Sequence, residues 1–228
     1  MKKLKYKPSV LNLDPSYGLV FTQDTIVDYL LEETNKDIPI NGKILEPAFG
    51  DAVWISSIIK SGYSYEKIDG YEVHEETFNM SKNKFEDKNI TLYNKDFLLT
   101  DIRKKYDFVF GGFPFLLLER SFYDQTDKDF LTSKYDIVNT ERLRLMSMFV
   151  VKIHKLLKDN GHATILLHRN FLDWPNLTAL RKFIYENFEI KRIIKGLTER
   201  PGMGILILKK SIGDNSSFMN KDKNYEVR

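Results

Sequence analysis

The chain has 228 residues, of which 42% are hydrophobic and none is cysteine. This size and composition favour one globular domain with a sizeable core, and they exclude disulfides and thiolate metal sites. The net charge of +3 allows a nucleic-acid partner but suits an ordinary solvated surface equally well. We find no apolar run long enough for a membrane span, and no apolar stretch behind the lysine-rich N-terminus that would make a secretory signal, so we expect a cytoplasmic protein.

The first segment with a regular pattern is a helix that follows a polar start. Residues 1–16 are rich in lysine and read as an arm or loop, with a disordered tail as the alternative. Thr22 or Asp24 is placed to cap a helix, which should end before the turn signal at Asn41-Gly42. Its apolar face would consist of Ile26, Val27, Leu30 and Leu31.

A strand, a turn and a helix then form the first half of a nucleotide-binding unit. The strand is Ile44–Leu45, the turn is Glu46–Ala52, and the helix runs from Val53 to about Ser61. The turn lacks the three glycines that cradle a pyrophosphate, and Glu46 introduces an acid before its glycine. This favours a cofactor with a cationic or amino group, although the Gly-Asp pair also fits Asp51 as a helix cap.

The second strand, Ile68–Val73, carries an acidic residue near its end. Glu72 lies 22 residues after Gly50. An acid at this spacing accepts hydrogen bonds from a ribose diol. The alternative is a glutamate on the surface.

A helix over Glu75–Phe85 and a third strand over Ile90–Tyr93 follow. Asp96 and Phe97 come directly after that strand. Such a pair can bind an adenine, because the carboxylate accepts from the amino group while the ring stacks. A turn with a core phenylalanine is the alternative.

The stretch Tyr106–Phe115 combines a buried strand with an aromatic turn. Phe108–Phe110 is an apolar run of the kind that fills a buried strand. Two glycines then break the strand, and Phe113-Pro114-Phe115 closes the stretch. Two aromatic rings at the mouth of a strand suit a flat ligand.

The remaining elements complete the sheet. Residues 119–140 are polar and predict a long loop near the active site. An amphipathic helix is expected over Thr140–Lys158, with Asn160-Gly161 as its stop signal. The later predictions are a strand at His162–Leu167, a turn at Asn170–Pro175, a helix at Asn176–Asn187, strands at Phe188–Ile194 and Ile205–Leu208 around a loop at 199–204, and a polar tail at 211–228.

This alternation predicts an α/β protein with a doubly wound, seven-stranded, mostly parallel sheet and helices on both faces. Ligands of such sheets bind at the carboxyl ends of the strands. We therefore expect Gly50, Glu72, Asp96 and the turn at 111–115 to converge on one edge.

Together these segments resemble the class I S-adenosylmethionine-dependent methyltransferases, which are Rossmann-like. Within that group they look most like the N6-adenine-specific DNA methyltransferases of restriction–modification systems. The resemblance covers about residues 17–210, which would form the catalytic domain, and Tyr17–Thr22 is similar to the family's N-terminal motif. It implies cofactor-binding roles for Phe21, Thr22, Glu46, Pro47, Ala48, Gly50, Glu72, Asp96 and Phe97.

The catalytic motif departs from the family pattern of Asn or Asp, Pro, Pro and an aromatic residue. Gly112 stands in place of the Asn or Asp, Phe113 in place of the first proline, and Pro114 and Phe115 match. In the family, the Asn side-chain oxygen and the backbone carbonyl of the following residue accept hydrogen bonds from the adenine amino group. The aromatic ring of the motif stacks on the base, which is flipped out of the duplex. Gly112 offers no side-chain acceptor. In the first cofactor motif, Ala52 replaces the usual second glycine.

The resemblance implies a methyltransferase that acts on the adenine amino group in nucleic acid, with DNA favoured over RNA. The alternative is a catalytically impaired, cofactor-binding or structural subunit of a methyltransferase complex.

A nicotinamide-dependent dehydrogenase is disfavoured by the missing three-glycine turn, and the four histidines show no metal-ligand spacing. We expect no metal and no separate target-recognition domain. Either another chain, a specificity or catalytic subunit, supplies specificity, or the substrate is short or single-stranded, or there is no nucleic-acid substrate. Basic residues that could meet phosphates, or form a solvated surface, are Lys2, Lys3, Lys5, Lys7, Arg181, Lys182, Lys191 and Arg192.

Overall fold

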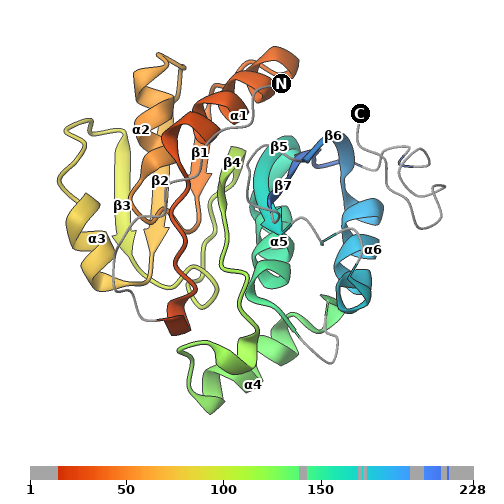
Figure 1. Ribbon diagram of the computed structural model, residues 1–228. Coiled ribbons are helices and arrows are strands. Elements are labelled where there is room, and N and C mark those ends of the chain that lie inside the picture. Colours follow the sequence, from red (N-terminus) through yellow and green to blue (C-terminus); the bar gives the residue numbers. More distant parts are fainter. Residues whose placement is uncertain are drawn as a thin grey trace.

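Seven strands form one sheet in the order β3-β2-β1-β4-β5-β7-β6 in the computed structural model of the chain (Figure 1). The strands are β1 (Lys43–Glu46), β2 (Lys67–Glu72), β3 (Ile90–Asn94), β4 (Tyr106–Gly112), β5 (Leu157–His168), β6 (Glu189–Lys195) and β7 (Met203–Lys209). The pairs among β1 to β5 are parallel, whereas β7 runs antiparallel to both β5 and β6. The predicted fold class is confirmed.

The structure describes residues 15–138, 143–168, 171, 174–195, 203–211 and 215. The predicted arm at 1–16 and polar tail at 211–228 lie almost entirely outside these residues. The same holds for most of the loop predicted at 199–204 and for part of the turn predicted at 170–175.

Helices cover both faces of the sheet because neighbouring strand residues point to opposite sides. In β4, Phe108 and Phe110 pack into one apolar cluster with residues of α1 and α2, whereas Val109 joins the second cluster with residues of α5 and α6. Burying each such side chain contributes about 1.5–3 kcal/mol. The helices are α1 (Asp24–Asp37), α2 (Val53–Lys60), α3 (Glu75–Ser81), α4 (Gln125–Lys134), α5 (Leu145–Leu156) and α6 (Thr178–Asn187).

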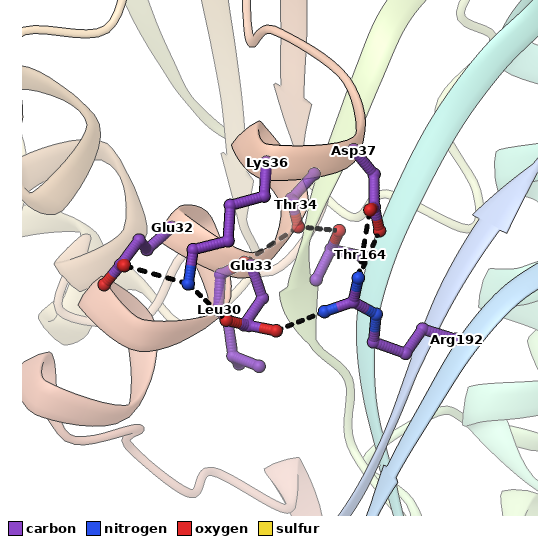
Figure 2. A network of polar contacts seen from close by, with 8 residues as sticks. All are labelled: Leu30, Glu32, Glu33, Thr34, Lys36, Asp37, Thr164 and Arg192. Carbon is purple, nitrogen blue, oxygen red and sulfur yellow. Dashed lines mark hydrogen bonds and ion pairs between the residues drawn. The ribbon is translucent and has the colours of Figure 1, made fainter. Parts of the chain in front are cut away.

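Polar contacts tie α1 to β5 and β6 (Figure 2). Arg192 of β6 forms ion pairs with Glu33 and, at 2.9 Å, with Asp37. The Thr34 hydroxyl lies 2.7 Å from that of Thr164 on β5, and it donates to the Leu30 carbonyl at 2.8 Å. Because α1 directly follows the segment that contains Phe21 and Thr22, these contacts fix the end of that segment against the sheet.

The prediction of a long loop over 119–140 is wrong for the residues that the structure describes. They contain the helix α4 and two short 3-10 helices, η2 (Leu118–Arg120) and η3 (Asp136–Val138). Asp124 caps α4 by accepting from the backbone N–H of Asp127 at 2.9 Å. Within α4 only Leu131 is buried, so the helix has almost no apolar periodicity from which it could be predicted.

The prediction that Asn160-Gly161 ends a helix is also wrong. The helix α5 ends at Leu156, and β5 begins at Leu157, which pairs with Tyr106. The register then shifts, and Asn160 adopts a left-handed conformation with φ of +60° inside this irregular part of β5. A Cβ on Gly161 would lie 2.9 Å from a backbone oxygen, so the close approach of the chain requires glycine here.

Four helices differ from their predicted ends. The helix α6 begins at Thr178 instead of Asn176. The N-cap residue of α1 is Gln23, without a side-chain cap, rather than Thr22 or Asp24. The helix α3 ends at Ser81 instead of Phe85, and α5 begins at Leu145, although residues 139–142 lie outside the described part of the chain. The predicted apolar face of α1 is confirmed, since all four of its residues are buried.

Candidate functional site

A pocket lies where β1, β2, β3 and β4 end. It contains about 830 Å³ of empty space, a figure that includes space open to solvent. Figure 1 places α4 and the short helix η1 (Pro15–Tyr17) at the same end of the sheet. The carboxyl ends of parallel strands are the usual ligand site of such a sheet.

Every predicted site residue except Glu46 lines this pocket. Because the strands are parallel and adjacent, residues that follow them in sequence meet at one edge, as expected. The predicted residues that line the pocket are Phe21, Thr22, Pro47, Ala48, Gly50, Glu72, Asp96, Phe97, Gly112, Phe113, Pro114 and Phe115.

Glu46 lies at the end of β1, directly before Pro47 and Ala48, but its side chain does not line the pocket. It is buried, and neither carboxylate oxygen has a hydrogen-bond partner among the residues that the structure describes. Burial raises the pKa of Glu46 well above its ordinary value, and the nearby carboxylates of Asp51 and Glu72 raise it further. Its contact with a cofactor stays a prediction.

The turn after β1 relies on left-handed backbone conformations. Gly50 has φ of +54°, and a Cβ there would lie 3.2 Å from the Phe21 ring, so glycine lets the N-terminal segment approach closely. Ala52, at the position of the family's second glycine, has φ of +59° and is the N-cap residue of α2. A left-handed alanine costs roughly 1–2 kcal/mol. Asp51 is therefore not the N-cap residue.

Glu72 is held at the end of β2 by two backbone donors. Its Oε2 accepts from the N–H of Gly50 and its Oε1 from the N–H of His74, both at 2.9 Å. Burial raises the pKa of Glu72, and these two hydrogen bonds act in the opposite direction. Glu72 is buried and lines the pocket, so it is not the surface glutamate of the alternative interpretation. Each oxygen keeps a lone pair for a further donor.

Asp96 and Phe97 follow β3 and also lie at the pocket. The Phe97 ring stacks on Phe149 of α5 with a centroid distance of 5.2 Å and meets Tyr71 edge-on. Oδ1 of Asp96 accepts from the N–H of Leu99 at 2.8 Å, as in a turn. The phenylalanine is thus a core residue, as in the alternative interpretation, and it also borders the pocket.

The altered catalytic motif begins at the last residue of β4. Gly112 is not left-handed, and a Cβ there would make ordinary contacts, 3.4 Å from Leu166 Cδ2 and 3.5 Å from Thr22 Oγ1. Phe113 is buried, and its ring stacks on Phe149 with a centroid distance of 5.1 Å. The carbonyl of Phe115 accepts from Arg144 at 2.9 Å.

Several pocket residues had no predicted role. Tyr17 and Phe122 stack with a centroid distance of 4.4 Å, and Tyr123 lies beside Phe122 at 4.3 Å. The Tyr123 hydroxyl donates to Oδ2 of Asp96 at 2.6 Å. The adjacent aromatic residues Phe122 and Tyr123, within the otherwise polar stretch 119–140, could have indicated a role at the pocket. The prediction of a loop over this stretch gave them none.

The charge of the pocket is negative. Among the residues that the structure describes, its charged lining residues are Glu72 and Asp96, and none is a lysine, arginine or histidine. A pyrophosphate would be repelled here, whereas a cationic ligand would be attracted. The pocket therefore disfavours the dehydrogenase interpretation.

The described basic residues considered for phosphate contact all have partners within the chain. Arg192 pairs with acids of α1, and Arg181 donates to the Phe171 and Trp174 carbonyls at 2.8 Å. Lys191 pairs with Glu189, and Lys182 with Glu186. The predicted lysines at 2, 3, 5 and 7 lie outside the described residues.

Within the described part of the chain, we find no acid and histidine cluster able to hold a metal ion and no helix able to span a membrane.

Comparisons with known proteins agree with this geometry. Residues 47–200, more than half of the chain, match the family described as Eco57I restriction-modification methylase. The type II methyltransferase M.HincII of Haemophilus influenzae is 24% identical over 179 residues, which are 78% of this chain and 33% of that protein. M.BstVI of Geobacillus stearothermophilus is 27% identical over an aligned length of 220 residues, and the match covers 78% of this chain and 38% of that protein. The chain thus spans about a third of the length of these curated relatives.

Solved structures share the fold. A class I S-adenosylmethionine-dependent methyltransferase from Listeria monocytogenes has a TM-score of 0.65 and 20% identity, with 90% of this chain and 62% of that chain covered. The methyltransferase subunit of a type I restriction–modification system from Streptococcus thermophilus has a TM-score of 0.61 and 16% identity, with 84% and 45% covered. With the fold and the extended family match in agreement, the chain belongs to the Eco57I restriction-modification methylase family.

Proposed function

We propose that the pocket binds S-adenosylmethionine. The observation that carries this proposal is the pair of carboxylates in the pocket, which suit the hydroxyl and amino donors of an adenosine and give the pocket a charge that attracts a cation. Among the described lining residues there is no lysine, arginine or histidine to bind a phosphate. Glu72 would accept from the ribose hydroxyls and Asp96 from the adenine amino group. When bound, the cofactor supplies a methyl group activated by the positive sulfur.

The remaining predicted residues have roles in the same proposal. Phe21 and Thr22 would contact the methionine part of the cofactor. Pro47, Ala48 and Gly50 would form the turn against which the cofactor lies, and glycine at 50 allows the close approach of the Phe21 ring to this turn. The predicted catalytic domain, residues 17–210, would therefore contain the complete cofactor site.

We propose that the acceptor is the amino group of adenine in nucleic acid, and DNA rather than RNA. Phe115 lines the pocket beside the end of β4, where it would stack on a base taken out of the duplex. The backbone carbonyl of Phe113, the residue after Gly112, would hold one N–H bond of the target amino group. This role for the chain also implies that it works in the cytoplasm.

The second acceptor of the family is missing, and a replacement from the following segment has little support. Asp124 caps α4, and neither Asp124 nor Asp127 lines the pocket. The nearest side-chain oxygen is the Thr22 hydroxyl, 3.5 Å from where a Cβ on Gly112 would lie. Loss of one preorganised polar partner typically lowers a rate by about 10²–10³-fold, so we expect slow methyl transfer.

A catalytically impaired subunit remains the second candidate. It is favoured by Phe113, whose buried ring stacks on Phe149 where the family has a proline, so the motif contributes to packing here. The methyltransferase from Streptococcus thermophilus that shares this fold is a subunit of a larger system, which is consistent with this candidate, although the similarity itself shows the fold alone. In either case we propose that a partner subunit supplies recognition of the target sequence.

The test is transfer of a labelled methyl group from S-adenosylmethionine to DNA and to RNA of matched sequence. We expect slow but measurable labelling of adenine in DNA, and less in RNA. Cofactor binding without any labelling across a broad panel of sequences would support the impaired subunit instead.

A further inference from the structure

The Asp96 carboxylate is oriented by two donors from different parts of the chain. Leu99 donates its backbone N–H to Oδ1 at 2.8 Å, and Tyr123 donates its hydroxyl to Oδ2 at 2.6 Å. Leu99 belongs to the same turn as Asp96, whereas Tyr123 comes from the segment after the catalytic motif. An ionised carboxylate only accepts hydrogen bonds and has about four acceptor positions, so each oxygen keeps room for another donor.

The backbone around Asp96 is fixed separately from its side chain. The carbonyl of Asp96 accepts from the backbone N–H of Thr100 at 3.0 Å and from its hydroxyl at 2.5 Å. The ammonium of Lys152, a buried residue of α5, donates to the carbonyls of Phe97 and Thr100. With the turn held by these contacts, the remaining freedom of Asp96 is the rotation of its side chain, which the Tyr123 hydroxyl restricts.

The Tyr123 hydroxyl is in a suitable environment for this role. The residue is buried, with only 6% of its surface exposed, and its ring packs against Phe122, which stacks on Tyr17. Burial raises the pKa of Tyr123, so the hydroxyl keeps its proton and remains a donor. Hydrogen bonds in such poorly hydrated surroundings are stronger than in water.

We propose that Tyr123 is a positioning residue that fixes the Asp96 carboxylate so that the cofactor site selects a purine with a 6-amino group over one with a 6-oxo group. This inference rests on the proposed binding of S-adenosylmethionine. A carboxylate held in this way accepts from an amino group, whereas it repels a carbonyl oxygen at the same position. Sites built to hydrogen-bond one group reject an analogue that lacks it.

The experiment compares the affinities of S-adenosylhomocysteine and S-inosylhomocysteine by calorimetry. We expect the unmodified protein to prefer the adenosyl compound by about 100-fold, and Tyr123→Phe to lower this ratio about 10-fold, because a carboxylate that the hydroxyl no longer holds can rotate away from a 6-oxo group. General loosening of the fold would weaken both ligands equally and leave the ratio unchanged. In an Asp96→Asn background, adding Tyr123→Phe should have no further effect on the ratio.

Tyr135→Phe is the matched control. Tyr135 is a buried tyrosine of the same segment, but its hydroxyl lies 3.5 Å from the Leu98 carbonyl and does not line the pocket. This variant should keep the ratio of the unmodified protein. An unchanged ratio in Tyr123→Phe, or equal binding of both ligands by the unmodified protein, would overturn the inference. Failure of the unmodified protein to bind S-adenosylhomocysteine at all would overturn the cofactor proposal as well.

Discussion

Gly112→Asn is expected to raise the rate of methyl transfer to adenine in DNA by about 10²–10³-fold, the typical contribution of one preorganised polar partner. An asparagine would restore the side-chain acceptor that the family uses at this position. The backbone accommodates the change, since Gly112 is not left-handed and its Cβ would meet Leu166 and Thr22 at ordinary contact distances. Single-turnover transfer of a labelled methyl group measures the rate.

Gly112→Ala separates chemistry from packing. It adds the same Cβ without an acceptor, so we expect a rate close to that of the unmodified protein. A rate for Gly112→Asn no higher than that of Gly112→Ala, with cofactor affinity intact, would show that the missing acceptor does not limit the reaction. Phe113→Pro is a poorer test, because loss of the buried ring beside Phe149 would leave a cavity that costs roughly 3–5 kcal/mol.

Glu72→Gln is expected to weaken binding of S-adenosylhomocysteine by about 100-fold. Hydrogen bonds to a charged group contribute about 1.5–3 kcal/mol each, and a tenfold change in affinity corresponds to about 1.4 kcal/mol. The glutamine amide would also direct its NH₂ group at the N–H of either Gly50 or His74, so two donors would face each other and one hydrogen bond would be lost. This should lower the free energy of unfolding by about 1–3 kcal/mol. Calorimetry and urea denaturation measure the two effects.

The ionisation of Glu72 adds a signature in pH. Since burial raises its pKa, the affinity of the unmodified protein should be full above this raised pKa and fall as the pH drops through it. Glu72→Gln should remove that part of the pH dependence. Glu76→Gln, on the exposed surface of α3, is the control and should change the affinity less than twofold. Equal affinities for Glu72→Gln and Glu76→Gln would contradict a ribose-binding role.

The site residues were predictable because they depend on a simple geometric rule. Glu72 ends a strand, Gly50 and Asp96 come shortly after one, and parallel strands bring such residues to one edge whatever the details of packing. All the predicted residues except Glu46 therefore line the pocket, although Tyr17, Phe122 and other residues that line it had no predicted role. The left-handed conformation of Ala52 could not be predicted in the same way, because an alanine in the sequence does not indicate a positive φ.

What could not be predicted depends on tertiary contacts. The helix α4 has a single buried residue, Leu131, so its formation rests on capping and packing rather than on periodicity. The contact between Tyr123 and Asp96 joins residues 27 positions apart, and no local pattern indicates it. Asn160-Gly161 suits a helix end and an irregular strand equally well, since both use a left-handed residue.

Titration of the unmodified protein with S-adenosylmethionine, and in parallel with NAD, tests the central claim most directly. The negative pocket predicts saturable binding of S-adenosylmethionine with one site per chain. It predicts no binding of NAD, because the charged lining residues in the described part of the chain are carboxylates, which would repel its pyrophosphate. Binding of NAD, or no binding of S-adenosylmethionine, would contradict the assignment of this pocket as a methyltransferase cofactor site.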